Sequence, residues 1–294
     1  MKRAILLAAG VAMALPGVGE AAAVPAGPGG YPYCQFVDRP EPELALSLGY
    51  VTREPIEGTH SDFGFVEERG HAEFGYFRTA AGDLSLGATL DAWIATGGQS
   101  VRLPAQFGRL SLDLRWDVRT REGLTFRMEA FPGFYNDFRE FSGDAFFVPF
   151  ALSGIQAIND QFSARVGVGI YPGFEAAFDP ILGLRWAPFD SLRIDAGYPE
   201  SRVAWTVVPD VTILAGFEIR RTLEFQTCDD VRGDFLYREW RAYLGTDLAL
   251  SDMAKCMVRA GTIRGRSVDF SAGDFQKRDV DNAFFFSIGI GGQF

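Results

Sequence analysis

Apolar and polar residues alternate with a period of two along most of this sequence, and no other feature restricts its fold as strongly. Between residues 109 and 118, Leu110 and Leu112 fall on one face of an extended chain, whereas Asp113 and Arg115 fall on the other. A helix would scatter these side chains around its axis, but a strand points successive side chains to opposite faces. The pattern therefore predicts β-strands with one apolar and one polar face.

Fourteen stretches of the chain follow this pattern. The predicted strands are 43–51, 71–79, 84–94, 109–118, 124–131, 146–157, 162–171, 180–187, 192–198, 203–208, 211–225, 235–249, 254–262 and 283–294. Tight turns alternate with mostly longer connections, the longest being 52–70 and 263–282. Short turns on one rim and longer loops on the other are typical of a membrane-spanning barrel. We expect an all-β, transmembrane, antiparallel up-and-down β-barrel of about 14 strands, with about 12 or 16 as the alternatives.

The composition is apolar overall, but the apolar residues are not concentrated in one continuous segment. The mean hydropathy is +0.02 and 14% of the residues are aromatic. After residue 23, however, no stretch approaches the roughly 18 uninterrupted apolar residues of a membrane-spanning helix. A barrel whose alternate residues face lipid has this property. The formal net charge of −10 argues against a nucleic-acid partner, because neutralising phosphates requires a basic surface.

The first residues predict a cleaved export signal. Lys2 and Arg3 precede an apolar run that ends near Leu15, and small residues follow up to Ala23. The alternative is a membrane-spanning helix, but Pro16 cuts the apolar run short of the length that a bilayer requires. We therefore predict a signal peptide over 1–23, an irregular segment rich in Pro and Gly over 24–42, and the barrel over 43–294.

The predicted last strand is amphipathic and ends on an aromatic residue. Phe284, Phe286, Ile288, Ile290 and Phe294 share one face. This ending resembles the assembly signal of Gram-negative outer-membrane β-barrel proteins, with Phe286, Ile288, Ile290 and Phe294 as the matching residues. The resemblance implies a porin-like barrel in the outer membrane of a Gram-negative bacterium. It also implies contact with lipid and lipopolysaccharide, and recognition by the barrel-assembly machinery.

A second resemblance covers residues 181–205, ILGLRWAPFDSLRIDAGYPESRVAW. This segment is similar to part of an uncharacterised outer-membrane barrel family, and the similarity implies no particular activity.

A soluble β-sandwich is the structural alternative, because its strands also alternate, with the apolar face buried against a second sheet. Three features favour the barrel: the terminal phenylalanine, the number of strands with one apolar face, and tryptophans near predicted strand ends. Trp116 and Trp186 stand where the aromatic girdle of a membrane barrel is expected.

A barrel of about fourteen strands is too wide for side chains alone to fill, since about eight strands already bring the walls into contact. The charged residues on the predicted inward faces are Asp113, Arg115, Asp117, Arg127, Glu129, Arg165, Arg185, Arg193, Asp195, Glu218, Arg220, Glu239, Arg241, Asp247 and Arg259. These residues predict a polar pore for small solutes. The alternative is a charge network that braces a non-conducting barrel with a structural or adhesive role. Inward glycines favour a water-filled lumen.

An enzyme is a third possibility, because His60, Ser61 and Asp62 lie in the predicted loop 52–70 and His71 follows closely. Only two histidines occur in the chain and the lipase motif G-x-S-x-G is absent, so we assign no catalytic residue. The glycine-rich end lies within a strand and opens no helix, so we assign no cofactor either.

Metal binding and disulfides have little support in the sequence. Cys228 is followed by Asp229 and Asp230, without a second cluster at ligand spacing, so no metal site is assigned. The acidic residues of the predicted first loop, Glu54, Glu57, Asp62, Glu67 and Glu68, are interpreted as a solvated surface that could attract divalent cations. One disulfide could form among Cys34, Cys228 and Cys256, with open connectivity.

The barrel interpretation requires that hydrocarbon covers the apolar faces of the strands. We expect the purified chain from residue 24 onward to stay monodisperse in detergent and to aggregate when the detergent is removed. Size-exclusion chromatography with light scattering measures this directly. A monodisperse species in plain buffer would instead support the β-sandwich.

Overall fold

The computed structural model describes residues 43–97, 103–120, 123–139, 141, 143–172, 178–228, 231–270 and 277–293, with the backbone alone for 221–232 and 293. The predicted signal peptide (1–23), the predicted lead-in (24–42) and Phe294 therefore lie outside the described residues. In the described part of the chain, no helix is long and apolar enough to cross a membrane.

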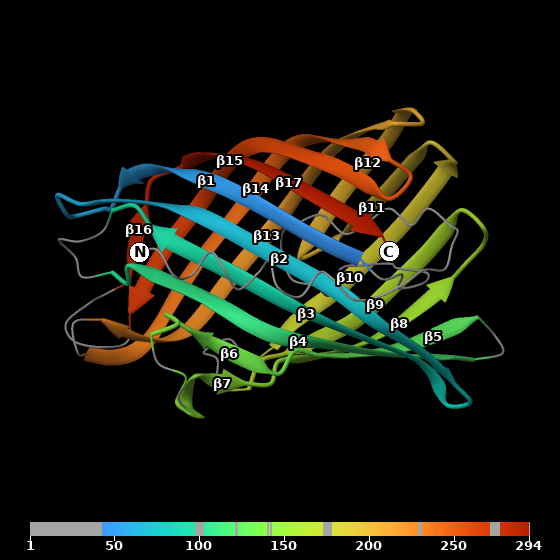
Figure 1. The fold of residues 1–294 in the computed structure, drawn as a ribbon, viewed down its shortest axis with the longest axis horizontal. Coiled ribbons are helices and arrows are strands. Elements are labelled where there is room, and N and C mark those ends of the chain that lie inside the picture. The colour runs from blue at the N-terminus through green and yellow to red at the C-terminus, as the bar shows by residue number, and fades with distance from the viewer. Residues whose placement is uncertain are drawn as a thin grey trace.

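The chain forms a closed antiparallel β-barrel with strongly tilted strands (Figure 1). Its fourteen wall strands are β1 (Glu43–Pro55), β2 (Asp62–Thr79), β3 (Gly82–Ala95), β4 (Gln106–Arg119), β5 (Leu124–Ala130), β8 (Phe150–Ala157), β9 (Phe162–Ile170), β10 (Phe178–Phe189), β11 (Leu192–Tyr198), β12 (Glu200–Val208), β13 (Val211–Cys228), β14 (Val231–Ser251), β15 (Ala254–Phe270) and β17 (Ala283–Gln293). Each pairs with the next, and β17 pairs with β1 from Glu43↔Gln293 to Val51↔Phe285. The predicted fold class is confirmed.

Three short strands complete the sheet: β6 (Gly133–Asn136), β7 (Phe146–Phe147) and β16 (Arg278–Val280). A 3-10 turn, η3 (Gly143–Ala145), precedes β7. β6 continues the line of β5, because both pair with β4 in one register, from Leu114↔Ala130 to Ser111↔Gly133. Pro132 interrupts the ladder between them, since proline has no N–H to donate.

The fourteen predicted strands coincide with the wall strands, except that residues 146–147 of the predicted strand 146–157 form β7, which pairs with β6. The two longest predicted connections are wrong. β1 runs to Pro55 and β2 begins at Asp62, so a six-residue turn, 56–61, replaces the predicted loop 52–70. β15 likewise runs to Phe270, into the predicted loop 263–282. These strand extensions carry apolar side chains on the inward face, so the expected order of apolar and polar positions is reversed there.

The two rims of the barrel differ. One rim, the turn end, carries the short connections that follow β2, β4, β8, β10, β12 and β14, together with the start of β1 and the end of β17. The other rim, the loop end, carries the remaining connections. These are not all long, because Pro199 alone joins β11 to β12. β13 and β14 are among the longest strands, with 18 and 21 residues, and extend well beyond β11 and β12 at the loop end.

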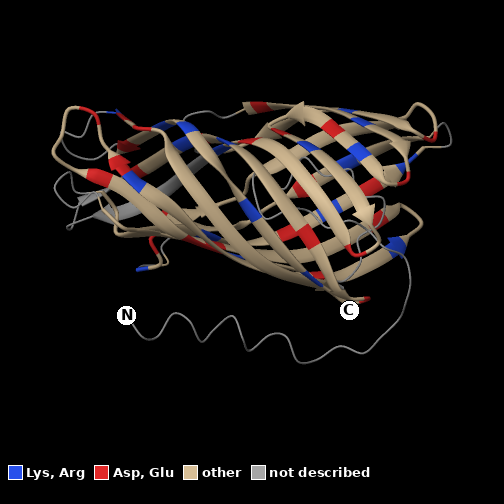
Figure 2. Cartoon of the chain, turned by 90° about the horizontal axis from the view of Figure 1, so that it is seen from above, with Lys and Arg blue, Asp and Glu red and all other residues tan. Residues whose placement is uncertain are grey.

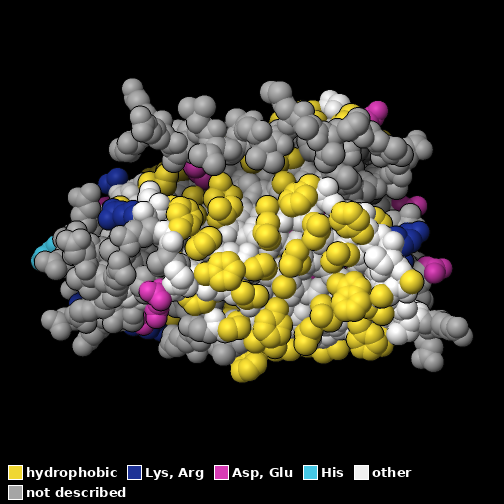
Figure 3. All heavy atoms as spheres, turned by 60° about the horizontal axis from the view of Figure 1, so that its bottom comes forward, with side chains coloured by type: hydrophobic (Ala, Val, Ile, Leu, Met, Phe, Trp, Pro, Cys, Tyr) yellow, Lys and Arg dark blue, Asp and Glu magenta, His cyan; other side chains and the backbone are white. Residues whose placement is uncertain are grey.

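The outer surface is a belt of exposed apolar side chains. Leu48, Leu112, Val166 and Leu244 are between 50% and 69% exposed although they sit in the middle of strands. Figure 3 shows one side of this belt, with charged side chains gathered towards the two ends of the molecule. The closed sheet leaves no second sheet to cover these side chains, so their exposure matches a surface made for hydrocarbon.

Aromatic residues mark both edges of the belt. At the turn end, Trp186 is 39% exposed and stacks on Phe162, with ring centroids 5.8 Å apart, and Trp205 is 52% exposed. At the loop end, Phe178 and Phe284 are 67% and 66% exposed. Rings at these two heights are expected where a membrane barrel crosses the interfaces between lipid and water.

The barrel narrows at the loop end into a second, smaller ring. Here Phe225 of β13 pairs in parallel with Asn136 of β6, which belongs to the other side of the barrel. On the remaining side, Ile56 at the end of β1 bridges to Val280 of β16. Nine of the described strands close this ring, which we call the neck: β1, β2, β3, β4, β6, β13, β14, β15 and β16.

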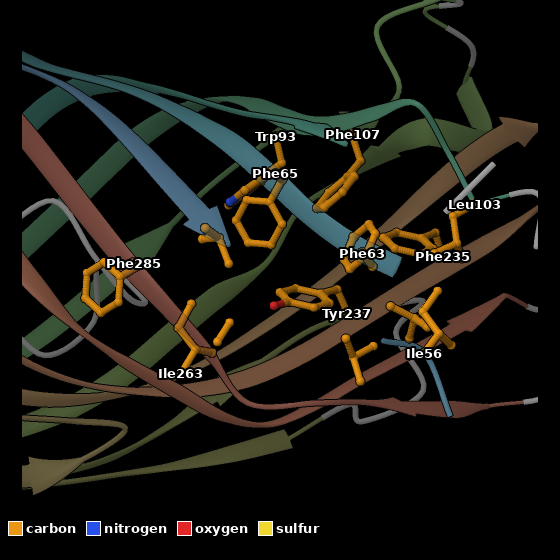
Figure 4. Close-up of a cluster of buried hydrophobic side chains, with 14 of the residues drawn as sticks. Ile56, Phe63, Phe65, Trp93, Leu103, Phe107, Phe235, Tyr237, Ile263 and Phe285 are labelled. Carbon is orange, nitrogen blue, oxygen red and sulfur yellow. The ribbon is translucent and has the colours of Figure 1, made fainter. Parts of the chain in front are cut away.

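The neck has a solid aromatic core. Phe63, Phe65, Phe107 and Phe235 are completely buried, and Tyr237 is 2% exposed. The rings of Phe107 and Phe235, from opposite walls, lie 4.9 Å apart, and Tyr237 packs edge-on against Phe65 at 5.5 Å. Figure 4 shows these rings meeting inside the barrel. Barrels of about eight strands are narrow enough for side chains to fill, which explains why a nine-stranded neck is packed although the wide section is not.

A charge on the apolar belt should destabilise the barrel in a bilayer. We expect Leu112→Arg to lower the free energy of unfolding by about 2–4 kcal/mol, the usual range for arginine facing lipid near the midplane. Urea titration of the chain refolded into liposomes measures the difference. Leu112→Ala is the matched control and should lose distinctly less. Equal losses for the two variants would argue against hydrocarbon at this position.

Candidate functional site in the barrel interior

The charged residues of the predicted inward faces are buried or half-buried, in contrast to the exposed apolar belt. Figure 2 shows that residues of both signs are distributed over the strands. Ten of the predicted inward residues are buried: Asp117, Arg127, Glu129, Arg165, Glu218, Arg220, Glu239, Arg241, Asp247 and Arg259. Asp113, Arg115, Arg185, Arg193 and Asp195 are half-buried. Burial of so many charges requires that they are paired.

Strand register brings opposite charges side by side. Asp117 and Arg127 are paired residues of β4 and β5, and two hydrogen bonds of 2.7 Å join the guanidinium to the carboxylate. Arg165 of β9 reaches past β8 to donate to Glu129 of β5 at 2.7 Å, and its Nε donates to Ser153 of β8 at 3.1 Å. Such forked pairs fix the wall geometry as well as neutralising charge.

A second group of pairs surrounds Asp195 of β11. Arg185, its register partner on β10, donates to it at 2.7 Å. Arg193 and Arg202 approach the same carboxylate at 3.5 and 3.7 Å. One carboxylate therefore faces three guanidinium groups on this part of the inner wall.

The two histidines do not form one site. His60 is exposed in the turn between β1 and β2, at the loop end, together with Ser61 and Asp62. His71 lies about 30 Å further along β2, inside the barrel. Its Nδ1 lies 3.0 Å from Thr89 Oγ1 and 3.2 Å from Asp113.

Glu67 joins opposite walls of the barrel. Its Oε1 accepts hydrogen bonds from Trp93 Nε1 of β3 at 3.0 Å, from Arg220 Nη1 of β13 at 2.6 Å, and from Arg69 Nη2. Its Oε2 accepts from Arg241 Nη1 of β14 at 2.8 Å. β1, β17 and β15 separate β2 from β14 along the wall, so these contacts cross the lumen. We call this layer the Glu67 bridge.

The Glu67 bridge continues into the neck. Arg241 Nε donates to Glu239 at 2.5 Å, and Tyr237 Oη donates to the other oxygen of Glu239 at 2.5 Å. Arg266 in turn donates to Tyr237 Oη at 3.1 Å and to the carbonyl of Phe63 at 3.1 Å. The polar layer and the aromatic core are therefore one connected unit.

The placement of Glu67 overturns the sequence interpretation of this residue. It was expected in an acidic, solvated surface loop, but it is 4% exposed inside the barrel. The available signal was that Phe63, Phe65, Glu67 and Arg69 follow one another at every second position. The opposite face carries Gly64, Val66, Glu68 and Gly70, so it lacks the apolar character that identified the other strands.

At least one inward glycine lies against an aromatic ring and leaves no space for water. Gly216 of β13 lies under the ring of Tyr243 of β14, and a Cβ at this position would collide with the ring. Tyr243 is 6% exposed. The argument that inward glycines leave space for water therefore does not apply here, because the glycine makes space for an aromatic side chain.

The residues of the predicted assembly signal lie on the apolar belt. Phe286, Ile288 and Ile290 of β17 are 47–52% exposed, whereas their neighbour Phe285 is 7% exposed and lies inside, under the guanidinium of Arg241 at 4.9 Å. Phe294 is outside the described residues, and recognition of this segment by the assembly machinery stays a prediction.

Of the three cysteines, only Cys256 has a described side chain. Cys256 carries a free, half-buried thiol. For Cys228 only the backbone is described, and Cys34, Asp229 and Asp230 lie outside the described residues.

No protein-family model matches the sequence, and no curated protein matches it significantly. Solved structures of outer-membrane porins and channels are similar in fold. The NanC porin is 9% identical with a TM-score of 0.43, covering 85% of this chain and 100% of the porin. The KdgM porin in complex with disordered oligogalacturonate is 9% identical with a TM-score of 0.39, covering 85% and 99%. An outer membrane channel from Pseudomonas putida F1 is 10% identical with a TM-score of 0.47, covering 86% and 96%.

Neutralising Glu67 should destabilise the barrel, because several buried arginines would lose their shared counter-charge. We expect Glu67→Gln to lower the free energy of unfolding by about 3 kcal/mol or more. Urea titration in liposomes gives the value. The control is Glu73→Gln, whose side chain is 17% exposed and pairs with Arg115 at 2.9 Å. Its loss should be on the order of 1 kcal/mol. If Glu67→Gln lost no more than this control, the bridge would have no structural role.

Proposed function

We propose that this chain is an outer-membrane channel for small polar solutes, whose wide section admits solute from the turn end and whose neck closes the path at the loop end. The observation that carries the proposal is solvent exposure inside the wide section. The side chains of His71, Arg193 and Glu73 point inward, yet they are 38%, 22% and 17% exposed to solvent. Water therefore has access to a charged interior that fourteen strands are too wide to fill.

The location in the proposal is supported by the apolar belt and its two aromatic edges, which suit a bilayer. An even number of antiparallel strands with short turns at one end is the architecture of bacterial outer-membrane barrels. The turn end would then face the periplasm and the neck the cell exterior. Lipopolysaccharide around the neck and small solutes in the wide section are the partners that follow from this orientation.

A second function is favoured by the neck itself. Its fully buried aromatic core leaves no polar path between Phe107 and Phe235, whose rings are in contact. A barrel that never opens this core would be a structural or adhesive protein of the envelope. The two functions differ in one property: a channel must conduct when the core of the neck is weakened.

Conductance through planar bilayers separates these functions. We expect the refolded chain to show rare openings, and the double variant Phe107→Ala/Phe235→Ala to raise the open probability at least about tenfold. Each truncation removes about 3–5 kcal/mol of core packing from the closed neck, and about 1.4 kcal/mol corresponds to a factor of ten. Heat-modifiable gel migration verifies that the variant is a folded barrel.

The matched control is Phe178→Ala/Phe286→Ala, which removes two phenylalanines from the lipid-facing belt and should leave the open probability unchanged. If the folded neck variant carried no current, the channel proposal would be wrong and the non-conducting barrel would be the better description.

A further inference from the structure

A cavity on the wide side of the Glu67 bridge is lined by an excess of cationic side chains. Four arginines surround it: Arg69, Arg220, Arg241 and Arg259. Two carboxylates, Glu67 and Glu218, also line it, together with Tyr243, Phe285 and the small residues Ser47, Gly49 and Ser287. The space between these side chains has a volume of about 10 Å3, enough for one particle of about the size of a water molecule, and it opens toward solvent.

The carboxylates that line the cavity are already engaged by its arginines. Glu67 already accepts four hydrogen bonds, from Arg69, Trp93, Arg220 and Arg241. Three of these hydrogen bonds converge on Oε1, and the one from Arg241 reaches Oε2. Glu218 is held by Arg220 Nη2.

Five buried N–H-bearing atoms of these arginines nevertheless have no hydrogen-bond partner in the described chain. They are Arg69 Nε, Arg220 Nε, Arg241 Nη2, Arg259 Nε and Arg259 Nη2. The side chains of Arg241 and Arg259 are 1% and 4% exposed. A buried donor on a charged group that lacks a hydrogen-bond partner is energetically costly. Five such donors around one cavity therefore indicate that a hydrogen-bond acceptor occupies it.

Carboxylates outside the cavity do not satisfy these donors. Asp247 approaches Arg259 Nη2 only to 3.8 Å, and Asp91 approaches Arg69 Nε only to 3.9 Å. Both distances are too long for hydrogen bonds. Glu239 is already held by Arg241 Nε at 2.5 Å. These carboxylates offset the charge of the arginines without accepting hydrogen bonds from their free donor atoms.

We infer that the cavity binds a small monovalent anion, either a halide or the carboxylate group of a solute, between Arg241 and Arg259. The effect on transport rests on the proposed function as a channel. Because the cavity lies between the wide section and the neck, an anion bound there makes the channel select anions over cations. Guanidinium donors in a partly buried space are well suited to carboxylates, which accept two parallel hydrogen bonds.

The test begins with binding, measured without any current. Excess line width in chlorine NMR spectra of the refolded barrel in detergent reports bound chloride, and added acetate should displace it. We expect Arg259→Gln to weaken chloride binding at least about tenfold, because a charged hydrogen-bond donor is lost. Arg259 Nε and Nη2 have no hydrogen-bond partner in the described chain, and heat-modifiable gel migration verifies that the variant is a folded barrel. Arg259→Lys, which keeps the charge, should retain part of the affinity.

Two further variants make the result decisive. Glu218→Gln removes a competing carboxylate and should strengthen chloride binding, the opposite sign to Arg259→Gln. Arg78→Gln is the matched control for the loss of a positive charge, because Arg78 lies at the turn end with its side chain 68% exposed. Chloride broadening that is absent, or equal in all four variants, would show that water alone occupies the cavity and would overturn the inference.

The consequence for transport is measured separately on the Phe107→Ala/Phe235→Ala background. Reversal potentials in a potassium chloride gradient should show chloride permeating better than potassium, and Arg259→Gln should reduce that preference. A conducting channel without anion preference would contradict the role of the cavity in selectivity. Absence of any current, with chloride still bound, would instead contradict the proposed function and leave the binding site intact.

Discussion

Backbone hydrogen bonding is the constraint on which this architecture depends. A strand in hydrocarbon has no water to satisfy its N–H and C=O groups, so every edge must find a partner. Pairing of β17 with β1 meets that requirement and makes the sheet a closed wall. Closure then divides the side chains into two populations, because alternate residues of every strand point outward and inward. The apolar belt and the charged interior both follow from this division.

Strand number explains why one barrel has two different interiors. Where fourteen strands form the wall, charges pair along the wall, as Asp117 does with Arg127, and water reaches the half-buried groups. Where nine strands form the neck, facing side chains meet and pack as they do in a soluble protein. The Glu67 bridge stands at the transition, where the walls are close enough for Glu and Arg to touch across the lumen but the lining is still polar.

The sequence was sufficient to predict the fold class, the number and order of the wall strands, and the sorting of side chains in the wide section. These follow from a simple rule of apolar outside and polar inside, which residues 109–118 obey. The neck could not be predicted, because Phe63, Phe65 and Phe107 obey the reverse rule and their partners on β14 lie far away in the chain. The same reversal hid Glu67, which was assigned to a loop, and no local pattern reveals that a residue will contact the opposite wall.

The composition of the neck has a consequence for biogenesis. Phe107 and Phe235 come from opposite halves of the chain. Asn136 pairs with Phe225 only where β13 reaches across the loop end of the barrel to β6. Contacts with such large sequence separation form late, after shorter loops have closed. The aromatic core of the neck can therefore pack only when the wall strands that carry these residues have taken their final order.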